Sequence, residues 1–517
     1  MKFKIQDSKF KTGGNIAAFL ILTFAFLIPY AKAQEQPPAP SAPREVKIPA
    51  IANSELPNGL KIAVAERRNL PLVSVSLLLN DAGADFEHKD GLANATAALL
   101  TKGTKTRTAT QIAEQIEFLG GNLDAGASWN SSVVSLSITS DKLEQALTIV
   151  SDVVLNPTFA QSEIDLFKTQ TNDELTVALK QPGSLASFVA SRYTFGEHNA
   201  VGTPESLKSI TNADITAFYQ RTYTPKNAVL IFAGDISSEQ ANALAKKFFG
   251  NWTMPDIMRP SEMDRIHVPT VGGNSLRSNL INRFLVVDLP NSGQAAVTYA
   301  KKLYTGRVSC ANNKCATDAT YYPSTVTNTI LGGGYSARLN AEIRIKRGLS
   351  YGAGSNLASR NSQTNLLARV QTKNETAAEV AELVAAEIAR LGSGLTEQTE
   401  LIPRQLTLTG AFGSSLETTG GLAAKLVELY TFGLSAGELN SYMMSVRNVS
   451  AEQVKNFAAA NVNGGDIIIV GDAKIFMDDL KKRFPTQKIE VIAASELDLN
   501  RNDLRKTVMS DSKPKAK

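Results

Sequence analysis

Histidine, cysteine and tryptophan are scarce in this chain of 517 residues, which contains three, two and two of them. Two cysteines exclude a disulfide-rich scaffold, and the composition excludes disorder and collagen. The histidines, His88, His198 and His267, are too far apart for the paired spacing of a helical zinc motif. The hydrophobic fraction of 43% is sufficient for a sizeable core. The length predicts two to four domains.

No apolar run at the N-terminus is long enough to cross a membrane. The segment from Ile16 to Ile28 has 13 residues and one polar member, Thr23, whereas a spanning helix needs about 20 apolar residues. Four lysines precede this segment, and Ala31-Lys32-Ala33 supplies small residues for cleavage. This pattern predicts a cleavable signal peptide over 1–33 and a leader over 34–50, with a membrane anchor as the alternative.

The net charge of +5 does not indicate a nucleic-acid surface, because most of it lies at the two ends. Residues 1–33 and 501–517 each carry +4, which leaves about −3 for residues 34–500. Nor do basic and aromatic residues alternate as in nucleic-acid-binding segments. The C-terminus lacks apolar periodicity, so we assign 491–517 to a disordered basic tail. A solvated tail is favoured over one that binds a phosphate surface.

The two cysteines, Cys310 and Cys315, enclose a short polar loop. In an exported chain this spacing favours a disulfide, which would contribute about 2 kcal/mol in the loop-entropy model. A metal site is the alternative. It would need further ligands, and no histidine lies within 40 residues.

The body alternates predicted strands and helices, and its second half repeats the first. Val73–Leu77 and Val134–Ile138 have the period-two pattern of half-buried strands, and helices are expected over 91–102, 109–119 and 161–180. Two pairs of segments match at offsets of 237–239 residues: 210–218 with 449–457, and 229–235 with 467–472. A repeat of this length indicates a duplicated domain. We predict domains over 51–253 and 275–490, joined by a linker over 254–274.

This duplicated chain resembles the pitrilysin/insulinase family of inverted-zincin metallopeptidases over residues 50–490. The resemblance rests on Leu56-Pro-Asn-Gly-Leu60, on Ala82-Gly-Ala84 and Gly91-Leu-Ala93 before the family's zinc helix, and on Lys102-Gly-Thr104 after it. It implies an α+β chain of two homologous metallopeptidase-like α/β sandwich domains that form half of a clamshell.

The family's zinc motif has been replaced in this chain. The family places H-x-x-E-H on the first helix and a glutamate ligand about 76 residues later. Here Asn94 stands at the first histidine, Ala97 at the general base and Ala98 at the second histidine, and only Glu174 matches the distant ligand. Alanine has no donor atom and an amide oxygen is a poor zinc ligand, so no metal site and no cofactor are expected in this chain. Glu174 is interpreted as a solvated or remnant residue.

A second family element is retained. Arg344 and Tyr351 have the seven-residue spacing of the Arg/Tyr pair that, in the family, reaches across the chamber to hold the substrate backbone. Arginine offers forked, permanently charged donors, and a phenol adds a directional one. The alternative is a solvated arginine and a packed tyrosine.

The resemblance therefore implies a non-zinc subunit of a periplasmic heterodimeric zinc endopeptidase. A homologous partner would supply H-x-x-E-H and the zinc, while this chain would close the chamber and bind the peptide through Arg344 and Tyr351. It would be inactive alone and, after signal cleavage, not inserted in a membrane. The alternative is an inactive scaffold or peptide-binding protein of the same fold.

Two further motifs carry no function. Gly348-Leu-Ser350-Tyr-Gly352 fits the serine nucleophile pattern, but no histidine follows it to complete a triad. Gly332-Gly-Gly334 lacks the Lys-Ser/Thr of a phosphate loop.

Overall fold

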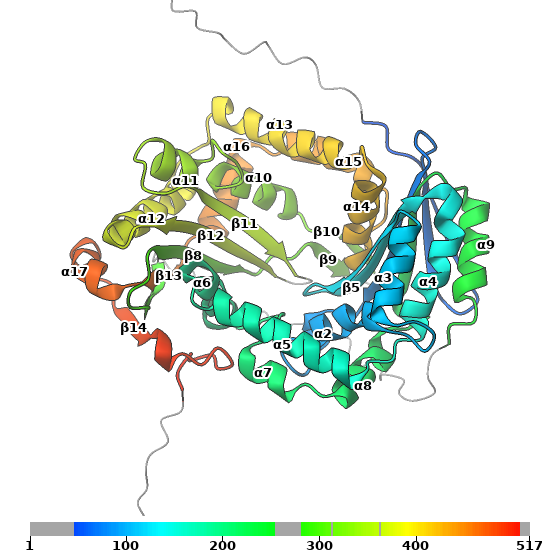
Figure 1. Ribbon diagram of the computed structural model, residues 1–517. Helices are drawn as coiled ribbons and strands as arrows, with labels where there is room; N and C mark the ends of the chain where they lie inside the picture. Colours follow the sequence, from blue (N-terminus) through cyan, green and yellow to red (C-terminus); the bar gives the residue numbers. More distant parts are fainter. Residues whose placement is uncertain (1–45, 254–280, 312–313, 361–362, 507–517) are drawn as a thin grey trace, which may run out of the picture. The chain divides into compact units, whose positions relative to one another are not determined.

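Two six-stranded mixed sheets with one shared strand order organise the chain (Figure 1). The computed structural model describes residues 46–253, 281–311, 314–360 and 363–506. The first sheet has the order β1-β2-β6-β3-β5-β4. Its strands are β1 (Ile51–Glu55), β2 (Lys61–Glu66), β3 (Leu72–Asn80), β4 (Asn122–Ala127), β5 (Ser131–Thr139) and β6 (Ala228–Gly234).

Strand β6 occupies the centre of this sheet because all of its residues are apolar or glycine and all are buried. It pairs parallel with β2 and antiparallel with β3. Strand β5, further out, alternates buried and more exposed positions over Val134–Ile138, as its period-two sequence predicts.

Helices cover one face of the first sheet and form a hydrophobic core with it. Four helices of this half begin at capping boxes, in which a Thr or Ser side chain and a residue three positions later satisfy the free N–H groups of the first turn. The helices of this half are α2 (Leu92–Leu99), α3 (Ala109–Phe118), α4 (Leu143–Leu155), α5 (Gln161–Ala178), α6 (Pro182–Ala190), α7 (Pro204–Ser209), α8 (Asn212–Thr222) and α9 (Ser238–Phe249).

The second sheet repeats the first, which confirms the predicted duplication. Read from its β14 edge, the order is β14-β7-β13-β8-β12-β11. Strand β14 takes the place of β1 but pairs parallel with β7, whereas β1 pairs antiparallel with β2. The strands are β7 (Ile281–Asp288), β8 (Ala295–Leu303), β11 (Ala353–Ser359), β12 (Thr364–Thr372), β13 (Gly465–Gly471) and β14 (Ile489–Ala493).

The helices of the second half follow the same sequence of elements. The matched segments 210–218 and 449–457 cover most of α8 and α16, and 229–235 and 467–472 lie mainly in β6 and β13. The helices are α10 (Tyr321–Leu331), α11 (Arg338–Asn340), α12 (Ala377–Ser393), α13 (Gln398–Ser415), α14 (Thr419–Thr431), α15 (Glu438–Arg447), α16 (Ala451–Phe457) and α17 (Ala473–Arg483).

The two halves exchange equivalent helices. Helix α6 of the first half packs on β8, β12 and β13 of the second sheet, and α14 of the second half packs on β3 and β6 of the first (Figure 1). Leu185 and Val189 of α6 are buried against Ile468 and Val470 of β13. Burial of a leucine or valine side chain contributes about 2 kcal/mol. Each half therefore supplies part of the other's core.

The C-terminal prediction is wrong for residues 491–506. Strand β14 continues to Ala493, and Leu499 and Leu504 are buried against the second sheet. Arg505 pairs with Leu497 in a β-bridge. Isolated leucines have no periodicity in the sequence. Leu499 and Leu504 are buried because they belong to an apolar cluster with side chains of β7, β13 and β14.

Several sequence predictions lie outside the described residues. They are the signal peptide over 1–33, most of the leader, the linker over 254–274 and the tail beyond residue 506. Within the described ranges, no helix is long and apolar enough to span a membrane.

Candidate functional site

The helix that would carry the zinc motif is α2, and its residues do not fit a metal. Asn94 and Ala98 lie one turn apart and are half-buried, while Ala97 is buried. Glu174 is exposed on α5, a helix that packs against α2. Among the residues that the structure describes, no group of three or more His, Cys, Asp or Glu could hold a metal ion. Helix α2 therefore presents no imidazole or carboxylate at Asn94, Ala97 or Ala98.

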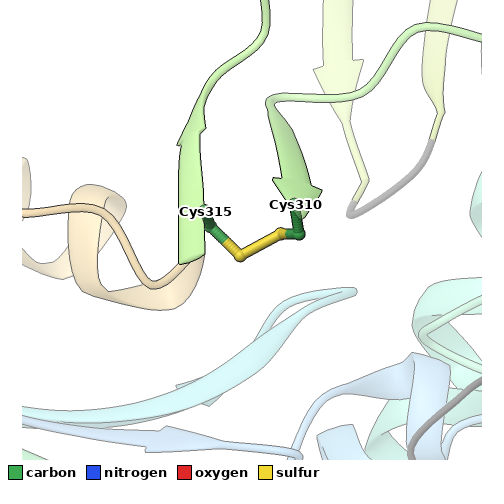
Figure 2. The surroundings of a disulfide bond; sticks show 2 residues. All are labelled: Cys310 and Cys315. Atoms are coloured by element: carbon green, nitrogen blue, oxygen red, sulfur yellow. A yellow bond between two sulfur atoms is a disulfide. The ribbon is translucent and has the colours of Figure 1, made fainter. Parts of the chain in front are cut away.

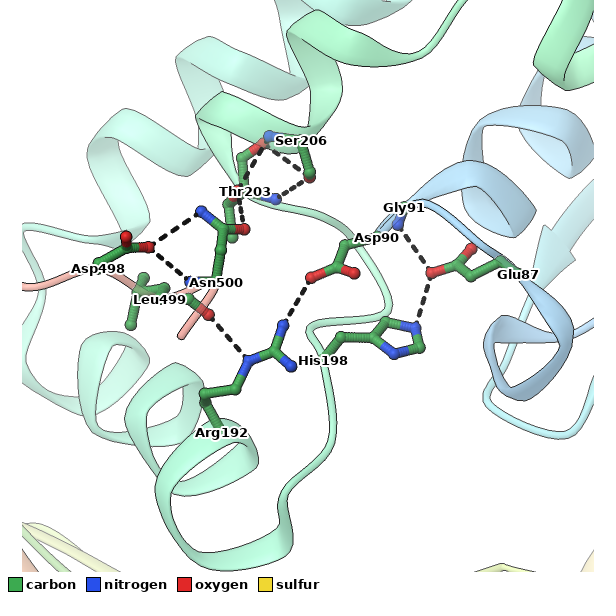
Figure 3. A network of polar contacts seen from close by, with 10 residues as sticks. All are labelled: Glu87, Asp90, Gly91, Arg192, His198, Thr203, Ser206, Asp498, Leu499 and Asn500. Carbon is green, nitrogen blue, oxygen red and sulfur yellow. Dashed lines mark hydrogen bonds and ion pairs between the residues drawn. The ribbon is translucent and has the colours of Figure 1, made fainter. Parts of the chain in front are cut away.

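The start of α2 is held by a carboxylate that the sequence analysis did not identify. Glu87 accepts hydrogen bonds from the N–H groups of Gly91 (2.8 Å) and Ala93 (2.6 Å), at the positive end of the helix (Figure 3). His198 Nε2 lies 2.8 Å from Glu87 Oε1. Burial alone lowers the pKa of His198, but the hydrogen bond and negative charge of Glu87 outweigh it, and the net pKa is raised.

A second ordered contact ties the C-terminal segment to the same region. Arg192 donates to Asp90 (2.9 Å) and to the carbonyl oxygen of Leu499 (3.1 Å), and Thr203 donates to Asn500 (2.9 Å) (Figure 3). Arg192 therefore links the loop before α2 to the C-terminal segment.

A buried carboxylate joins the two halves close to this helix. Glu197, which is 7% exposed, accepts from Arg360 Nε (3.2 Å) and Nη2 (2.9 Å), from Gln363 (2.8 Å) and from Asn365 (2.9 Å). The Arg360 guanidinium also lies 4.7 Å from the ring centroid of Trp129. The two-point ion pair with Arg360 and the hydrogen bonds from Gln363 and Asn365 offset the cost of burying the Glu197 carboxylate.

The sequence contained little sign of these residues. Glu87 and His198 are 111 positions apart, and Glu197 and Arg360 are 163 positions apart. The only local signal is that Glu197 and His198 are adjacent titratable residues. In the sequence, His198 is one of three widely spaced histidines.

Arg344 and Tyr351 flank a turn in the second half. Arg344 lies in the π-helical turn Ala341–Ile345. Three residues after this turn, Gly348 adopts a left-handed φ of 65° and donates to the Arg344 carbonyl oxygen (2.9 Å). Arg344 is exposed, with its guanidinium 5.2 Å from the centroid of Tyr335. Tyr351 is 89% exposed just before β11. Within the described ranges neither side chain has an acidic partner.

Ser350, the residue that matched the serine nucleophile pattern, has a structural contact instead. Its Oγ donates to the carbonyl oxygen of Gly352 (2.7 Å) and accepts from the N–H of the same residue (3.0 Å). The hydroxyl closes the turn that presents Tyr351.

The two cysteines form a disulfide within a short hairpin (Figure 2). Cys310 on β9 (Val308–Ala311) lies directly opposite Cys315 on β10 (Lys314–Thr317). At the base of the hairpin, the buried Arg307 lies over the Tyr321 ring at 3.7 Å and donates to Thr317. The hairpin is thereby anchored to the start of α10.

Comparisons with known proteins agree with this fold. Residues 61–199 match the model described as insulinase (peptidase family M16), and residues 209–400 match the model described as peptidase M16 inactive domain. The fold is that of a metallopeptidase, and the helix that would hold its metal lacks the donors. The chain belongs to the peptidase M16 family, which confirms the pitrilysin/insulinase resemblance.

Curated relatives carry zinc protease names. An uncharacterized zinc protease of Mycobacterium leprae is 28% identical over 309 residues, which are 58% of this chain and 64% of that protein. The uncharacterized zinc protease YmxG of Bacillus subtilis is 23% identical over 70% of this chain and 83% of its own length. A probable mitochondrial-processing peptidase subunit beta of Arabidopsis thaliana is 27% identical over 39% of each chain.

Solved structures show the same fold. A peptidase M16 inactive domain from Pseudomonas fluorescens has a TM-score of 0.69 and 26% identity, covering 81% of this chain and 98% of that one. A protease from Helicobacter pylori has a TM-score of 0.72 at 18% identity, covering 82% of this chain and all of that one.

Proposed function

We propose that this chain is the non-zinc subunit of a periplasmic heterodimeric zinc endopeptidase. The observation that carries the proposal is the contrast between two elements. Helix α2 has alanine or asparagine at every position of the zinc motif, whereas Arg344 and Tyr351 are exposed and have no acidic partner among the described residues. A pure scaffold has no need of an unpaired arginine and tyrosine at this spacing.

In the proposed complex, Arg344 and Tyr351 bind the backbone of a peptide substrate. The guanidinium donates to carbonyl oxygens in a fixed fork, and the phenol adds one directional donor. Donors already in place where negative charge develops stabilise that charge without reorganisation. Neither group performs proton transfer in this proposal.

The partner is a homologous subunit that carries an intact H-x-x-E-H and the zinc. The signal-peptide prediction supports an exported complex, and the name of the Arabidopsis relative, a processing peptidase subunit, supports a family role within an assembly. The chain alone is then inactive towards peptides.

The test is reconstitution with a homologous subunit that carries an intact H-x-x-E-H, with cleavage of an unfolded fluorogenic peptide as the readout. Arg344→Ala should lower kcat/KM by about 100-fold, and Tyr351→Phe should lower it less. Size-exclusion chromatography should show unchanged assembly. The matched controls are Arg447→Ala and Tyr304→Phe, which alter an exposed arginine and an exposed tyrosine elsewhere.

Full activity of the Arg344→Ala/Tyr351→Phe double variant would contradict the proposed clamp. If the assembled, zinc-loaded pair cleaves no peptide, the second candidate takes precedence. That candidate is an inactive scaffold or peptide-binding protein of the same fold, and the loss of every metal donor from α2 favours it.

A further inference from the structure

A cavity of about 680 Å³ lies between α6 and the second sheet, and Tyr351 forms part of its wall. Its other walls come from the first turns of α6, from β8 and from β12. All but one of the residues that line it are uncharged, and the exception is Arg369. The cavity therefore carries one positive charge and no carboxylate.

Arg369 on β12 and Thr298 on β8 are directly opposite in the antiparallel register, so their side chains project from the same face of the sheet. Arg369 has two contacts, both long and both to neutral atoms: 3.5 Å to Ser187 Oγ and 3.4 Å to Asn356 Oδ1. No ion pair to Arg369 is present in the described part of the chain. Its charge is available to a ligand.

Thr298 also lines the cavity, and the residue is 1% exposed. Its hydroxyl can donate one hydrogen bond to a ligand in the cavity.

From this arrangement we infer that the cavity is a subsite for a carboxylate of the bound peptide. A guanidinium fork pairs with a carboxylate through two parallel hydrogen bonds, and a hydroxyl beside it can donate a third. Tyr351 belongs to both the cavity wall and the proposed backbone clamp, so a peptide held by the clamp would place a neighbouring group in the cavity. The inference rests on the proposed function and specifies its substrates as peptides that place a carboxylate in this cavity.

The carboxylate can come from a Glu or Asp side chain or from a peptide C-terminus. Three fluorescent ten-residue peptides separate these sources: one blocked at both ends with a central Glu, its blocked Gln counterpart, and the Gln peptide with a free C-terminal carboxylate. Direct binding to the purified full chain is measured by anisotropy, so no partner and no catalysis are needed.

We expect either carboxylate peptide to bind about tenfold more tightly than the blocked Gln peptide. Arg369→Gln should remove this preference, Arg369→Glu should transfer it to a blocked Lys peptide, and Thr298→Val should reduce it. Arg447→Ala, which alters an exposed arginine on α15, should leave it unchanged.

Equal binding of the three peptides, no binding of any of them, or a preference that survives Arg369→Gln would overturn the subsite. Failure of the proposed function gives a different result from failure of the subsite. In that case the carboxylate preference persists in direct binding, while the complex with the zinc-bearing homologue cleaves nothing or does not respond to Arg344→Ala.

Discussion

Glu197 and Arg360 form a two-point ion pair that connects the first half of the chain to the second, with Nη2 of Arg360 2.9 Å from Oε2 of Glu197. The pair lies beside the loop that begins α2, because the adjacent His198 contacts Glu87 of that loop. The Glu197–Arg360 contact between the halves and the start of helix α2 therefore belong to one polar network.

Replacing one partner of this pair should strongly destabilise the fold. Arg360→Ala leaves the Glu197 carboxylate buried without its cation, and we expect the free energy of unfolding to fall by about 3 kcal/mol. Urea denaturation followed by circular dichroism measures the change. The control is Glu144→Gln, which breaks an exposed pair with Lys247 and should cost less than about 1 kcal/mol. Equal effects of the two substitutions would show that the halves are not joined through Glu197.

The contact of His198 with Glu87 should make stability depend on pH. The pKa of His198 is raised in the folded state, so its contribution is fully present below the unfolded value of about 6.5. That contribution is lost as the pH rises through the higher folded-state pKa. The stability difference between the wild type and His198→Gln should be larger at pH 6 than at pH 9. His88→Gln, which alters an exposed histidine, is the control, and a pH-independent difference for His198→Gln would refute the assignment.

Helix α2 should bind zinc only after its ligands are restored. The wild type should show no rise in melting temperature with excess zinc, because Ala98 has no donor atom. Asn94→His with Ala98→His places two imidazoles one turn apart, near Glu174 of the neighbouring α5. Zinc should raise the melting temperature of this variant by at least about 2 °C, reversibly with chelator. The single Asn94→His variant is the control, and a zinc response of the wild type would contradict the loss of the site.

The turn before α2 should tolerate only glycine. Gly91 has a φ of 92°, and a Cβ there would lie 3.0 Å from backbone atoms of Val201 and Gly202. Gly120, with a φ of 73° and open space around it, provides the matched control. We expect Gly120→Ala to lower the free energy of unfolding by about 1 kcal/mol, because alanine is strained at a positive φ. Gly91→Ala should lower it by about 3 kcal/mol, because its Cβ would also press against rigid backbone. Denaturant titration of both variants measures this, and equal losses would show that the loop can move aside.

The main elements of the fold could be predicted because their signals are local. The buried apolar run of β6, the alternation in β5 and the helix over 161–180 are visible within short windows, and the repeat offset then implied two similar halves. The C-terminal segment could not be predicted in this way. Leu499 and Leu504 are buried in a cluster with side chains of β7, β13 and β14, which come from distant parts of the chain.

In the candidate site, too, some features could be predicted from the sequence and others could not. The missing metal donors at Asn94, Ala97 and Ala98 and the spacing of Arg344 and Tyr351 are visible in the sequence. The cavity is not, because it depends on Arg369 lying opposite Thr298 and on α6 covering a sheet of the other half.

The sequence by itself determined the family, the duplication and the loss of the zinc ligands, since each depends on residue identity at a fixed spacing. Only the tertiary structure decided the exchange of α6 and α14, the Glu197–Arg360 pair and the single charge in the cavity. These features arise where segments more than 100 residues apart come into contact, and the sequence pattern of one segment does not record which surface of another it will meet.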